Sequence, residues 1–326
     1  MPAPLTATAI AHPNIALVKY WGKRDDAANL PATGSLSVTL DAMRSRTRVR
    51  FEPGRSGDSV RLDGREDAGT SRRVSACLDL LRRRAGVRHG AVVDSDNDFP
   101  TGAGLASSAS GFAALVTAAA AALGLDLPLD ELARVARLGS GSAPRSLFGG
   151  FALLRNRADG EVAVGPLLAA EAWPLRVVIA ITSAAHKEVS SRDGMAASRE
   201  TSPYYGEWLH SHAADLDAGV RHVQGRDFTA LATLAEHSCL KMHAVMMTTR
   251  PPLLYWMPAT LGCLQAVQAL RRAGTPVFFT IDAGPQVKAV CEPAAVPAVR
   301  EALAAVPGVI RVVDSGLGPG AYCLDA

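Results

Sequence analysis

The sequence predicts an α+β fold built from two halves. Its first 60 residues carry the short apolar and alternating runs that are typical of β-strands, and residues 106–138 carry helical patterns. After a series of long helices, the last 50 residues return to strands, in the order strand, strand, helix, strand. This change of pattern places a boundary near residues 175–180, so we expect one domain over 1–178 and a second over 179–326.

Four β segments are expected near the N-terminus, at residues 6–23, 35–40, 46–52 and 59–64. In the third, Val49 and Phe51 share one side of the strand, and the other side carries arginines at 44, 46, 48 and 50. This arginine face is either a solvated side of a sheet or a surface that binds anions. We favour the solvated side because Phe51 is the only aromatic residue in the cluster and no stacking platform is visible.

The rest of the first half alternates helices with strands. An arginine-rich helix is expected at about 70–84 and a strand at 91–95. An alanine-rich helix follows over 106–123 and is ended by Gly124, and Pro128 opens another that runs to about 138. Apolar strands are then expected at 150–155, 161–167 and 176–182.

In the second half, the sequence predicts helices before the closing sheet. The helices are expected at about 193–201, 207–222, 226–244 and 258–273. They are followed by strands at 277–281 and 287–291, a helix over 294–305 and a strand at 309–315. One strand, helices and then β-β-α-β is the element order of a ferredoxin-like domain.

Composition excludes several classes of protein. The 326 residues are 48% hydrophobic and 20% charged, with a formal net charge of +3, as in an ordinary folded protein. We expect neither a nucleic-acid nor a membrane partner, because the net charge is small and no export signal or long apolar run is present. Five scattered cysteines without a CxxC pair predict neither disulfides nor zinc, which favours a cytoplasmic setting.

The positive charge is nevertheless uneven. Residues 44–88 contain 13 arginines, no lysine and six acidic residues. Of these arginines we assign only Arg73 to a ligand, as explained below, and we expect the others to be solvated.

A glycine-rich loop before the alanine-rich helix is the strongest local signal for a binding site. Residues 99–109, FPTGAGLASSA, join small residues to a helix N-terminus, where unpaired N–H groups and the helix dipole favour phosphate. The loop is not a Walker A motif because no GK[ST] follows. By itself it is either structural or phosphate-binding.

A second loop of the same kind spans residues 139–146, GSGSAPRS. Its two hydroxyls, flexible backbone and Arg145 guanidinium are suited to a diphosphate or a carboxylate. The alternative is a surface turn with a solvated arginine.

Two further residues are candidates by position. Lys19 falls among apolar neighbours when the first segment is counted by twos from Ile15, so it is either buried with an anionic partner or extends to water at a strand edge. Asp282 follows an apolar strand and precedes Ala-Gly-Pro, so it either forms a turn or presents its carboxylate to a cleft.

Other chemistries find no support in the sequence. The eight histidines show no metal-ligand spacing, so no protein metal site is expected. No GxSxG nucleophile elbow exists, which disfavours a serine hydrolase.

Taken together, five blocks resemble the mevalonate diphosphate decarboxylases of the GHMP kinase superfamily. They are NIALVKYWGKRD (14–25), PTGAGLASSASGFAA (100–114), RLGSGSAPRSLFGGFALL (137–154), HKEVSSRDGM (186–195) and FTIDAGPQVK (279–288). The resemblance implies the GHMP kinase fold, with an N-terminal ribosomal-protein-S5-like α/β domain and a C-terminal ferredoxin-like α+β domain. It also implies an enzyme that converts (R)-5-diphosphomevalonate and ATP to isopentenyl diphosphate, ADP, phosphate and CO2.

The resemblance also implies roles for individual residues. Asp282 would act on the 3-hydroxyl as base or orienting group, Lys19 would stabilise it and the transferring phosphoryl group, and Arg145 would bind the carboxylate. The substrate diphosphate and its neighbouring groups would be held by Tyr20, Trp21, Gly22, Lys23, Arg73, Ser140, Gly141, Ser142, Ala143 and Ser191. The ATP phosphates would be held by Gly102, Ala103, Gly104, Leu105, Ala106, Ser107 and Ser108. Mg²⁺ would arrive with ATP.

Two departures from the family pattern leave the substrate open. Pro144 stands where many members carry cysteine or another small residue, and Gly102 stands where alanine is common. A related GHMP enzyme would instead act on mevalonate 5-phosphate or only phosphorylate the 3-hydroxyl. A catalytically silent binding member of the fold is a further alternative, which the presence of Lys19, Arg145 and Asp282 disfavours. A homodimer is the default expectation for an enzyme of this kind.

Overall fold

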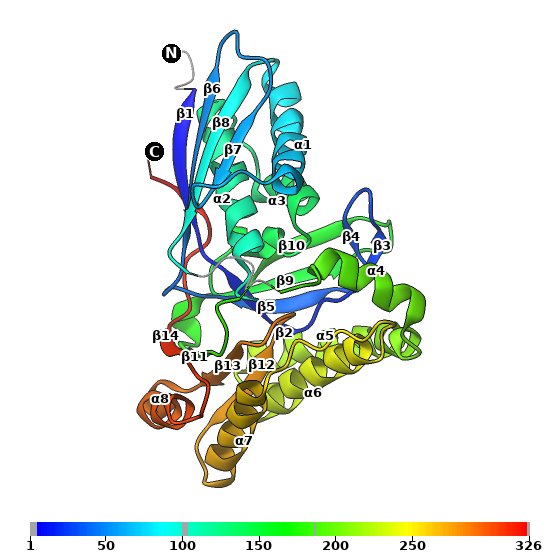
Figure 1. The fold of residues 1–326 in the computed structure, drawn as a ribbon, viewed down its shortest axis with the longest axis vertical. Helices are drawn as coiled ribbons and strands as arrows, with labels where there is room; N and C mark the ends of the chain where they lie inside the picture. Colours follow the sequence, from blue (N-terminus) through cyan, green and yellow to red (C-terminus); the bar gives the residue numbers. More distant parts are fainter. Residues whose placement is uncertain (1–4, 100–103, 186, 325–326) are drawn as a thin grey trace.

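The computed structural model describes residues 5–99, 104–185 and 187–324, which form three main sheets and eight α-helices. The molecule is elongated, with the first part of the chain at one end and the helices of the second half at the other (Figure 1). A four-stranded sheet lies between these ends. None of the described helices is long and apolar enough to cross a membrane.

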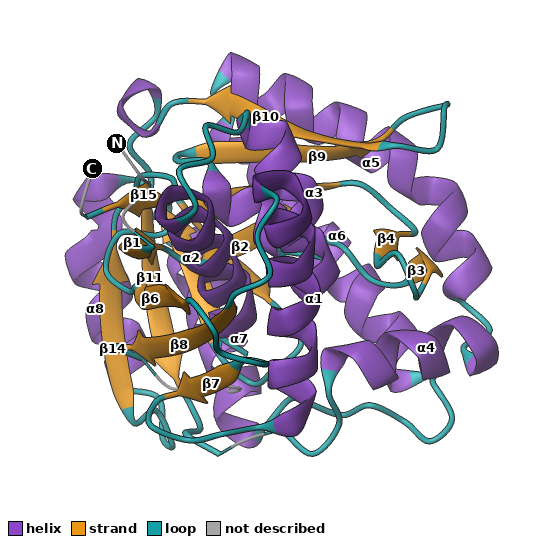
Figure 2. Cartoon of the chain, turned by 90° about the horizontal axis from the view of Figure 1, so that it is seen from above, coloured by secondary structure: helices purple, strands orange, loops and turns teal. Residues whose placement is uncertain are grey.

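The N-terminal end is a five-stranded sheet with three helices on one face (Figure 2). The strand order is β15-β1-β6-β8-β7, and β7 is parallel to β8 whereas the other neighbours are antiparallel. The strands are β1 (Thr6–Ala11), β6 (Ser45–Glu52), β7 (Ser59–Leu62), β8 (Gly90–Asn97) and β15 (Tyr322–Cys323). The helices are α1 (Ala68–Ala85), α2 (Ser107–Ala122) and α3 (Leu129–Gly139). The alanines of α2 let this helix pack closely on β1 and β6.

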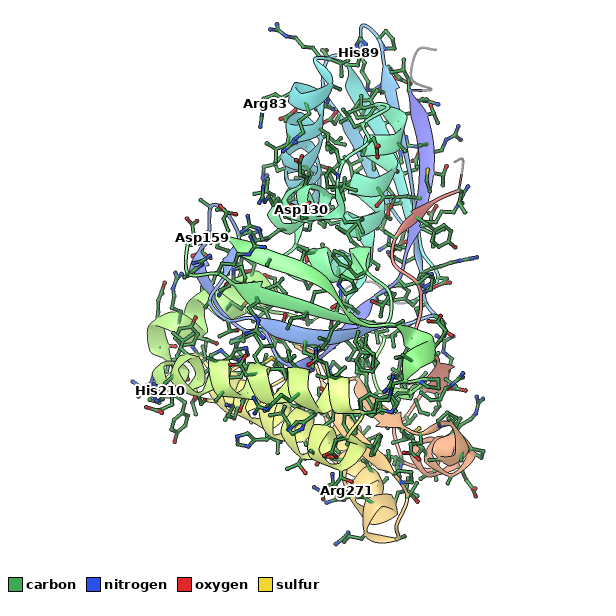
Figure 3. The ribbon with its side chains drawn as sticks, turned by 180° about the vertical axis from the view of Figure 1, so that it is seen from behind. Arg83, His89, Asp130, Asp159, His210 and Arg271 are labelled. Carbon is green, nitrogen blue, oxygen red and sulfur yellow. The ribbon has the colours of Figure 1, made fainter. Side chains whose placement is uncertain are left out.

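The arginine face of β6 is solvated, as predicted. Side chains alternate between buried and exposed along this strand, and the register places Arg46 opposite Asp96 and Arg48 opposite Asp94. The expectation that all the other arginines of residues 44–88 are solvated is wrong for Arg82. This side chain is 11% exposed and forms an ion pair with Asp58, whereas its neighbour Arg83 points away from the molecule (Figure 3).

The middle sheet has the order β10-β9-β5-β2 and is antiparallel. Its strands are β2 (Asn14–Val18), β5 (Ser35–Thr39), β9 (Phe151–Asn156) and β10 (Val162–Leu168). A small hairpin of β3 (Lys23–Asp25) and β4 (Leu30–Pro31) and the 3-10 helices η1 (Ala143–Leu147) and η2 (Ala170–Ala172) flank it.

The segment predicted as one strand over residues 6–23 is therefore two strands, β1 and β2, and it ends at the first residue of β3. The chain leaves the first sheet at His12–Pro13 and enters the middle sheet as β2, because proline has no N–H with which to continue a ladder. β2 then ends at Val18, and the chain re-forms a strand only at Lys23.

The C-terminal half confirms the ferredoxin-like prediction. Its sheet has the order β12-β13-β11-β14, all antiparallel, which is the strand order of that fold. The strands are β11 (Arg176–Ile181), β12 (Val277–Ile281), β13 (Val287–Cys291) and β14 (Arg311–Ser315). The helices are α4 (Ser191–Thr201), α5 (Tyr205–Gly225), α6 (Phe228–Met247), α7 (Pro258–Arg272) and α8 (Val296–Ala304), with the 3-10 helix η3 (Pro293–Ala295) before α8.

Both faces of this C-terminal sheet are buried. Phe278 and Val290 face the core shared with the middle sheet and with helices α5 and α6, whereas Phe279 and Ala289 face α7 and α8. Helix α6 contacts both β2 and β12. Strands that are far apart in the sequence are thereby held side by side where β2 and β12 end.

Candidate active site

A cavity of about 820 Å³ is lined by residues from both halves of the chain. Its wall is made by the segment after β2, the start of α1, the start of α2, the loop from α3 to η1, the start of α4 and the turn after β12. Most of the site residues expected from the sequence lie here. They are Lys19, Tyr20, Trp21, Lys23, Arg73, Gly104, Ala106, Ser107, Ser108, Ser140, Gly141, Ser142, Arg145, Ser191 and Asp282.

The other expected site residues are placed differently. Gly22, Leu105 and Ala143 are not among the residues that line the cavity, and the side chains of Leu105 and Ala143 are buried in hydrophobic clusters. Gly102 and Ala103 lie outside the described residues.

Lys19 and Asp282 form a close ion pair at the centre of the cavity wall. Lys19 Nζ donates to Asp282 Oδ1 at 2.6 Å, and the lysine side chain is only 1% exposed. Its backbone N–H donates to Ser238 Oγ at 2.9 Å, which fixes the chain where β2 ends. The interpretation of Lys19 as a strand-edge lysine that extends to water is wrong, and so is the interpretation of Asp282 as turn chemistry alone.

A second lysine stabilises the same carboxylate. Lys288 Nζ lies 3.3 Å from Asp282 Oδ2. Burial by itself would raise the pKa of Asp282, but Lys19 and Lys288 outweigh it and hold that pKa below its ordinary value. Asp282 is therefore an anion at neutral pH.

Arg145 is buried, which makes the alternative interpretation of a solvated arginine in a surface turn wrong. Its side chain is 3% exposed, Nε donates to Asn14 Oδ1 at 2.9 Å, and Nη1 donates to Ser35 Oγ. Burial lowers its pKa to about 10, although Asp282 opposes the shift. Because the hydrogen-bond partners are neutral oxygens, the guanidinium retains its charge for an anion in the cavity. Pro144 stands at the start of η1, where its missing N–H is tolerated.

The two glycine loops meet in the cavity. Ser140 Oγ lies 3.3 Å from Ser108 Oγ and 3.2 Å from Ser142 Oγ, so a row of hydroxyls joins the start of α2 to the loop before η1. Helix α2 begins without a side-chain cap, and its first residues, Ser107 and Ser108, line the cavity, where the positive end of the helix dipole favours an anion. Gly104 has a φ of +81°, and a Cβ there would lie 2.9 Å from Gly284 Cα, so this loop presses on the turn that carries Asp282.

A group of cations lies along another part of the wall. Burial and the nearby Arg192 guanidinium lower the pKa of Lys23 to about 8 and also lower that of Arg73. Arg73 donates to the carbonyl of Gly139 at 3.1 Å, which ties α1 to the second glycine loop. Cations that lower one another's pKa in this way favour the binding of a multiply charged anion between them.

Lys187 and Arg192 are among the cavity residues that were missed from the sequence. Lys187 Nζ donates to Ser191 Oγ at 2.6 Å and to the carbonyl of Ala283 at 3.2 Å. Burial lowers its pKa to about 8, with Asp282 opposing the shift. Both residues stand in the block of residues 186–195 that also contains Ser191, so their proximity in sequence to an expected site residue could have identified them.

The aromatic side chains beside this site hold the segment that follows β2. Trp21 Nε1 donates to Ser198 Oγ at 3.0 Å, and Trp208 Nε1 donates to the Trp21 carbonyl at 2.9 Å. Tyr205 lies directly over Gly22, where a Cβ would clash with its ring. The Tyr20 hydroxyl is buried, and this burial raises its pKa above the ordinary value.

The donor set suits a nucleotide phosphate better than a metal cage. In the part of the chain that the structure describes, no group of three or more His, Cys, Asp or Glu side chains could hold a metal ion. Serine hydroxyls, a helix N-terminus and lysines fit phosphate oxygens. A Mg²⁺ ion needs few protein oxygens when phosphates supply the others, so ATP with Mg²⁺ fits these residues.

Comparisons with known proteins point to one family. Residues 11–164 match the diphosphomevalonate decarboxylase-like N-terminal domain, and residues 177–313 match the mevalonate 5-diphosphate decarboxylase C-terminal domain. The chain is 33% identical to the diphosphomevalonate decarboxylase of Candida albicans, over 97% of both chains. It is 38% identical to the human diphosphomevalonate decarboxylase, over 86% of this chain and 76% of the human one.

Solved structures agree in fold. Mevalonate diphosphate decarboxylase from Staphylococcus aureus has a TM-score of 0.91 and 36% identity, over 98% of both chains. The enzyme from Enterococcus faecalis has a TM-score of 0.87 and 38% identity, over 98% of this chain and 99% of that one. A complex described as MDDEF with MVAPP, AMPPCP and magnesium has a TM-score of 0.90 and 39% identity, with the same coverage. The chain has the GHMP kinase fold and belongs to the diphosphomevalonate decarboxylase family.

Proposed function

We propose that this protein catalyses the ATP-dependent decarboxylation of (R)-5-diphosphomevalonate to isopentenyl diphosphate, ADP, phosphate and CO2. The observation that carries the proposal is that one cavity combines three features. These are the cations Lys23, Arg73 and Arg192, the Lys19–Asp282 pair, and the uncapped start of α2. The cations suit the substrate diphosphate, the ion pair suits the reacting hydroxyl, and the start of α2 suits the nucleotide.

The substrate diphosphate would be held by the cation group. Lys23, Arg73 and Arg192 supply the charge, and hydrogen bonds would come from Tyr20, Ser140, Ser142, Ser191 and the backbone of Gly141 and Ala143. Trp21 and Gly22 would shape the wall. The buried Arg145 guanidinium would bind the substrate carboxylate and hold it at the angle needed for loss of CO2.

Asp282 and Lys19 would act on the 3-hydroxyl. Since Asp282 is a stabilised anion, its first task is to orient the hydroxyl and receive its proton as the oxygen is phosphorylated. Lys19, 2.6 Å away, places a positive charge beside the developing negative charge on the phosphoryl oxygens. When phosphate leaves the tertiary carbon it takes up the proton that Asp282 received, and the carboxylate restored in this way stabilises the positive charge that develops there.

The nucleotide would bind at the start of α2. Ser107, Ser108 and the N–H groups of residues 102–106 would hold its phosphates. ATP supplies the phosphoryl group that turns the 3-hydroxyl into a leaving group, and Mg²⁺ neutralises the phosphate charges. The relative solved with MVAPP, AMPPCP and magnesium supports this pair of ligands.

Three further properties are proposed for this chain. The domains divide between residues 178 and 179, which lie within β11 (Arg176–Ile181). All five cysteines are free thiols, which supports a reducing, cytoplasmic setting. The oligomeric state is a homodimer, the commonest state for such enzymes, which analytical ultracentrifugation of the purified protein tests.

Parallel assays of CO2 release test the activity. Purified protein with ATP and Mg²⁺ is given diphosphomevalonate or mevalonate 5-phosphate, and Asp282→Ala serves as the control. We expect CO2 from the diphosphate, much less from the monophosphate, and almost none from the variant. Preference for the monophosphate, or ATP consumption without CO2, would favour the related GHMP activities. Full activity of Asp282→Ala would refute the catalytic assignment.

A further inference from the structure

Lys288 is the one charged side chain of β13, and it is fully buried behind the cavity. It is 0% exposed, and it is not among the described residues that line the cavity, whereas Lys19, Gly104 and Asp282 are. Burial of an ammonium group costs free energy unless its charge is paired and its N–H groups find hydrogen-bond acceptors. Lys288 therefore acts on whatever surrounds its Nζ atom rather than on a ligand.

Two groups surround that atom, and each belongs to a different part of the site. Lys288 Nζ donates to the carbonyl oxygen of Gly104 at 2.9 Å and lies 3.3 Å from Asp282 Oδ2. Gly104 belongs to the loop before α2, and Asp282 to the turn after β12. One ammonium group thus bridges the nucleotide loop and the reacting carboxylate.

The two oxygens of Asp282 face opposite environments. Oδ2 is fully buried, whereas the side chain as a whole is 23% exposed, so the exposed part does not include Oδ2. Oδ1 accepts the hydrogen bond from Lys19 at 2.6 Å. Lys288 therefore holds the carboxylate from behind, while Lys19 pairs with its other oxygen.

The contact with Gly104 sets the direction of a peptide group. In a trans peptide the C=O of one residue and the N–H of the next point in opposite directions. Lys288 draws the Gly104 carbonyl toward the protein interior, which turns the N–H of Leu105 the other way, away from Lys288. Glycine allows this peptide to flip with little steric cost, so the loop needs such a restraint.

We propose that Lys288 is a positioning residue of the proposed decarboxylase, which holds the Asp282 carboxylate and the Gly104–Leu105 peptide in one arrangement and so couples nucleotide binding to the reacting hydroxyl. The inference rests on the proposed function. Because Lys288 does not line the cavity, its effect on diphosphomevalonate binding is small.

The charges around Asp282 determine the sign of its pH effect. Lys19, Lys288, Lys187 and Arg145 are the cations that interact with it, and Cys239 and His243 of α6 are the titratable groups that face it from behind. Removal of Lys288 leaves fewer cations to favour the carboxylate. The pKa of Asp282 then rises, and activity that depends on the carboxylate is lost at a higher pH on the acid side.

The main test is Lys288→Met, which keeps an unbranched chain and removes the charge. We expect kcat to fall about tenfold or more and the acid limb of its pH profile to move up by about one unit, as loss of one close charge predicts. KM for ATP rises, and KM for diphosphomevalonate stays within about twofold of wild type. Lys241→Met is the matched control. Lys241 Nζ lies 2.5 Å from Asp215 Oδ2, and neither residue lines the cavity. Its replacement should leave the pH profile unchanged.

A second variant keeps the test informative if Lys288→Met does not fold. Lys288→Arg retains the charge but replaces a compact donor by a wider planar one. The acid limb then stays at its wild-type position while KM for ATP rises, because the Gly104 carbonyl is displaced. If Lys288→Arg moves the acid limb by as much as Lys288→Met does, the electrostatic part of the proposal is wrong.

Binding measurements separate this proposal from the proposed function. The affinity for a non-hydrolysable ATP analogue with Mg²⁺ is measured by calorimetry in wild type, Lys288→Met, Asp282→Asn and the double variant. We expect Lys288→Met to weaken binding in both backgrounds, whether or not wild type releases CO2. Unchanged nucleotide affinity, or an unmoved acid limb in an active Lys288→Met enzyme, overturns the proposal; absence of CO2 release by wild type overturns only the function.

Discussion

At the residue scale, the site is organised around one carboxylate and the cations that face it. Asp282 is held by Lys19 at 2.6 Å and by Lys288 at 3.3 Å, and burial alone would have favoured its neutral form. The two lysines keep it ionised, so it is prepared to orient a hydroxyl and to stabilise positive charge. Its low pKa makes it a weak base, so in the proposed mechanism it accepts the proton only as phosphorylation makes the hydroxyl acidic.

Replacement of this carboxylate by an amide tests its charge separately from its shape. Asp282→Asn is expected to lower kcat for CO2 release by about 10²–10⁴-fold, the usual contribution of a positioned acid or base. KM for diphosphomevalonate changes little because the diphosphate cations are intact. Steady-state kinetics measures both values, and a kcat within threefold of wild type would contradict the role of the charge.

A pH dependence is expected for substrate binding. Burial lowers the pKa of both Lys23 and Lys187 to about 8, so each is charged below pH 8 and loses its proton above it. A polyanionic ligand favours the charged lysines. Affinity for diphosphomevalonate is therefore highest below pH 8 and falls above it, by up to about tenfold per pH unit for each lysine that must be charged.

Calorimetry of diphosphomevalonate binding between pH 7 and 9.5 checks this prediction. Proton uptake on binding near pH 8, seen as a dependence of the binding heat on the buffer, is the second expected sign. Lys23→Met should flatten the pH dependence. Affinity that does not change across this range would show that neither lysine titrates in the free protein.

At the element scale, the glycine loop and helix α2 work as one unit. The helix begins without a side-chain cap, and Gly104 adopts a φ of +81° against Gly284. Both features follow from local sequence, because small residues allow the close approach and the alanine-rich run forms the helix. The loop and the Asp282 turn are therefore in close contact.

Gly104→Ala is expected to weaken nucleotide binding. A Cβ would lie 2.9 Å from Gly284 Cα, and the left-handed backbone strains any residue with a side chain. We expect KM for ATP to rise about tenfold, in line with a strain of about 1–2 kcal/mol. Gly111→Ala within α2 is the matched control, since a Cβ there meets nothing within 4 Å and should leave KM for ATP unchanged.

The whole molecule is held together by the end of the chain. After β14 the chain returns to the N-terminal half, where the N–H of Gly318 donates to the Thr39 carbonyl at 2.7 Å and β15 pairs with β1. The loop before β9 also donates to Gly318, from the N–H of Gly150 at 3.0 Å. The last strand thus ties the ferredoxin-like half to the sheet that begins the chain.

A side chain at Gly318 should disturb this contact. A Cβ there would lie 2.1 Å from the carbonyl oxygen of Leu40, which is backbone and cannot turn aside. We expect Gly318→Ala to lower the free energy of unfolding by about 1–3 kcal/mol, the usual cost of overpacking. Thermal unfolding measures it, with Gly206→Ala at an open position as the control. Equal melting temperatures for the two variants would contradict the prediction.

The elements and both glycine loops could be predicted from the sequence because their signals are local. Apolar periodicity, Gly124 after α2 and Pro128 before α3 are read over a few residues. The one strand predicted over residues 6–23 was wrong because a proline break and a change of sheet leave the apolar pattern almost unaltered. Recognition of the family came from five such local blocks.

The sequence by itself determined the fold class and the family, and it predicted the candidate site residues. Only the tertiary structure decided which charges are buried and paired: Lys19 and Asp282 are 263 residues apart in sequence, and Arg145 lies 131 residues from Asn14. Lys288 reads as an ordinary strand residue until β12, β13 and the loop before α2 are packed together. A charge's environment is set by every chain segment around it, so no local pattern specifies it.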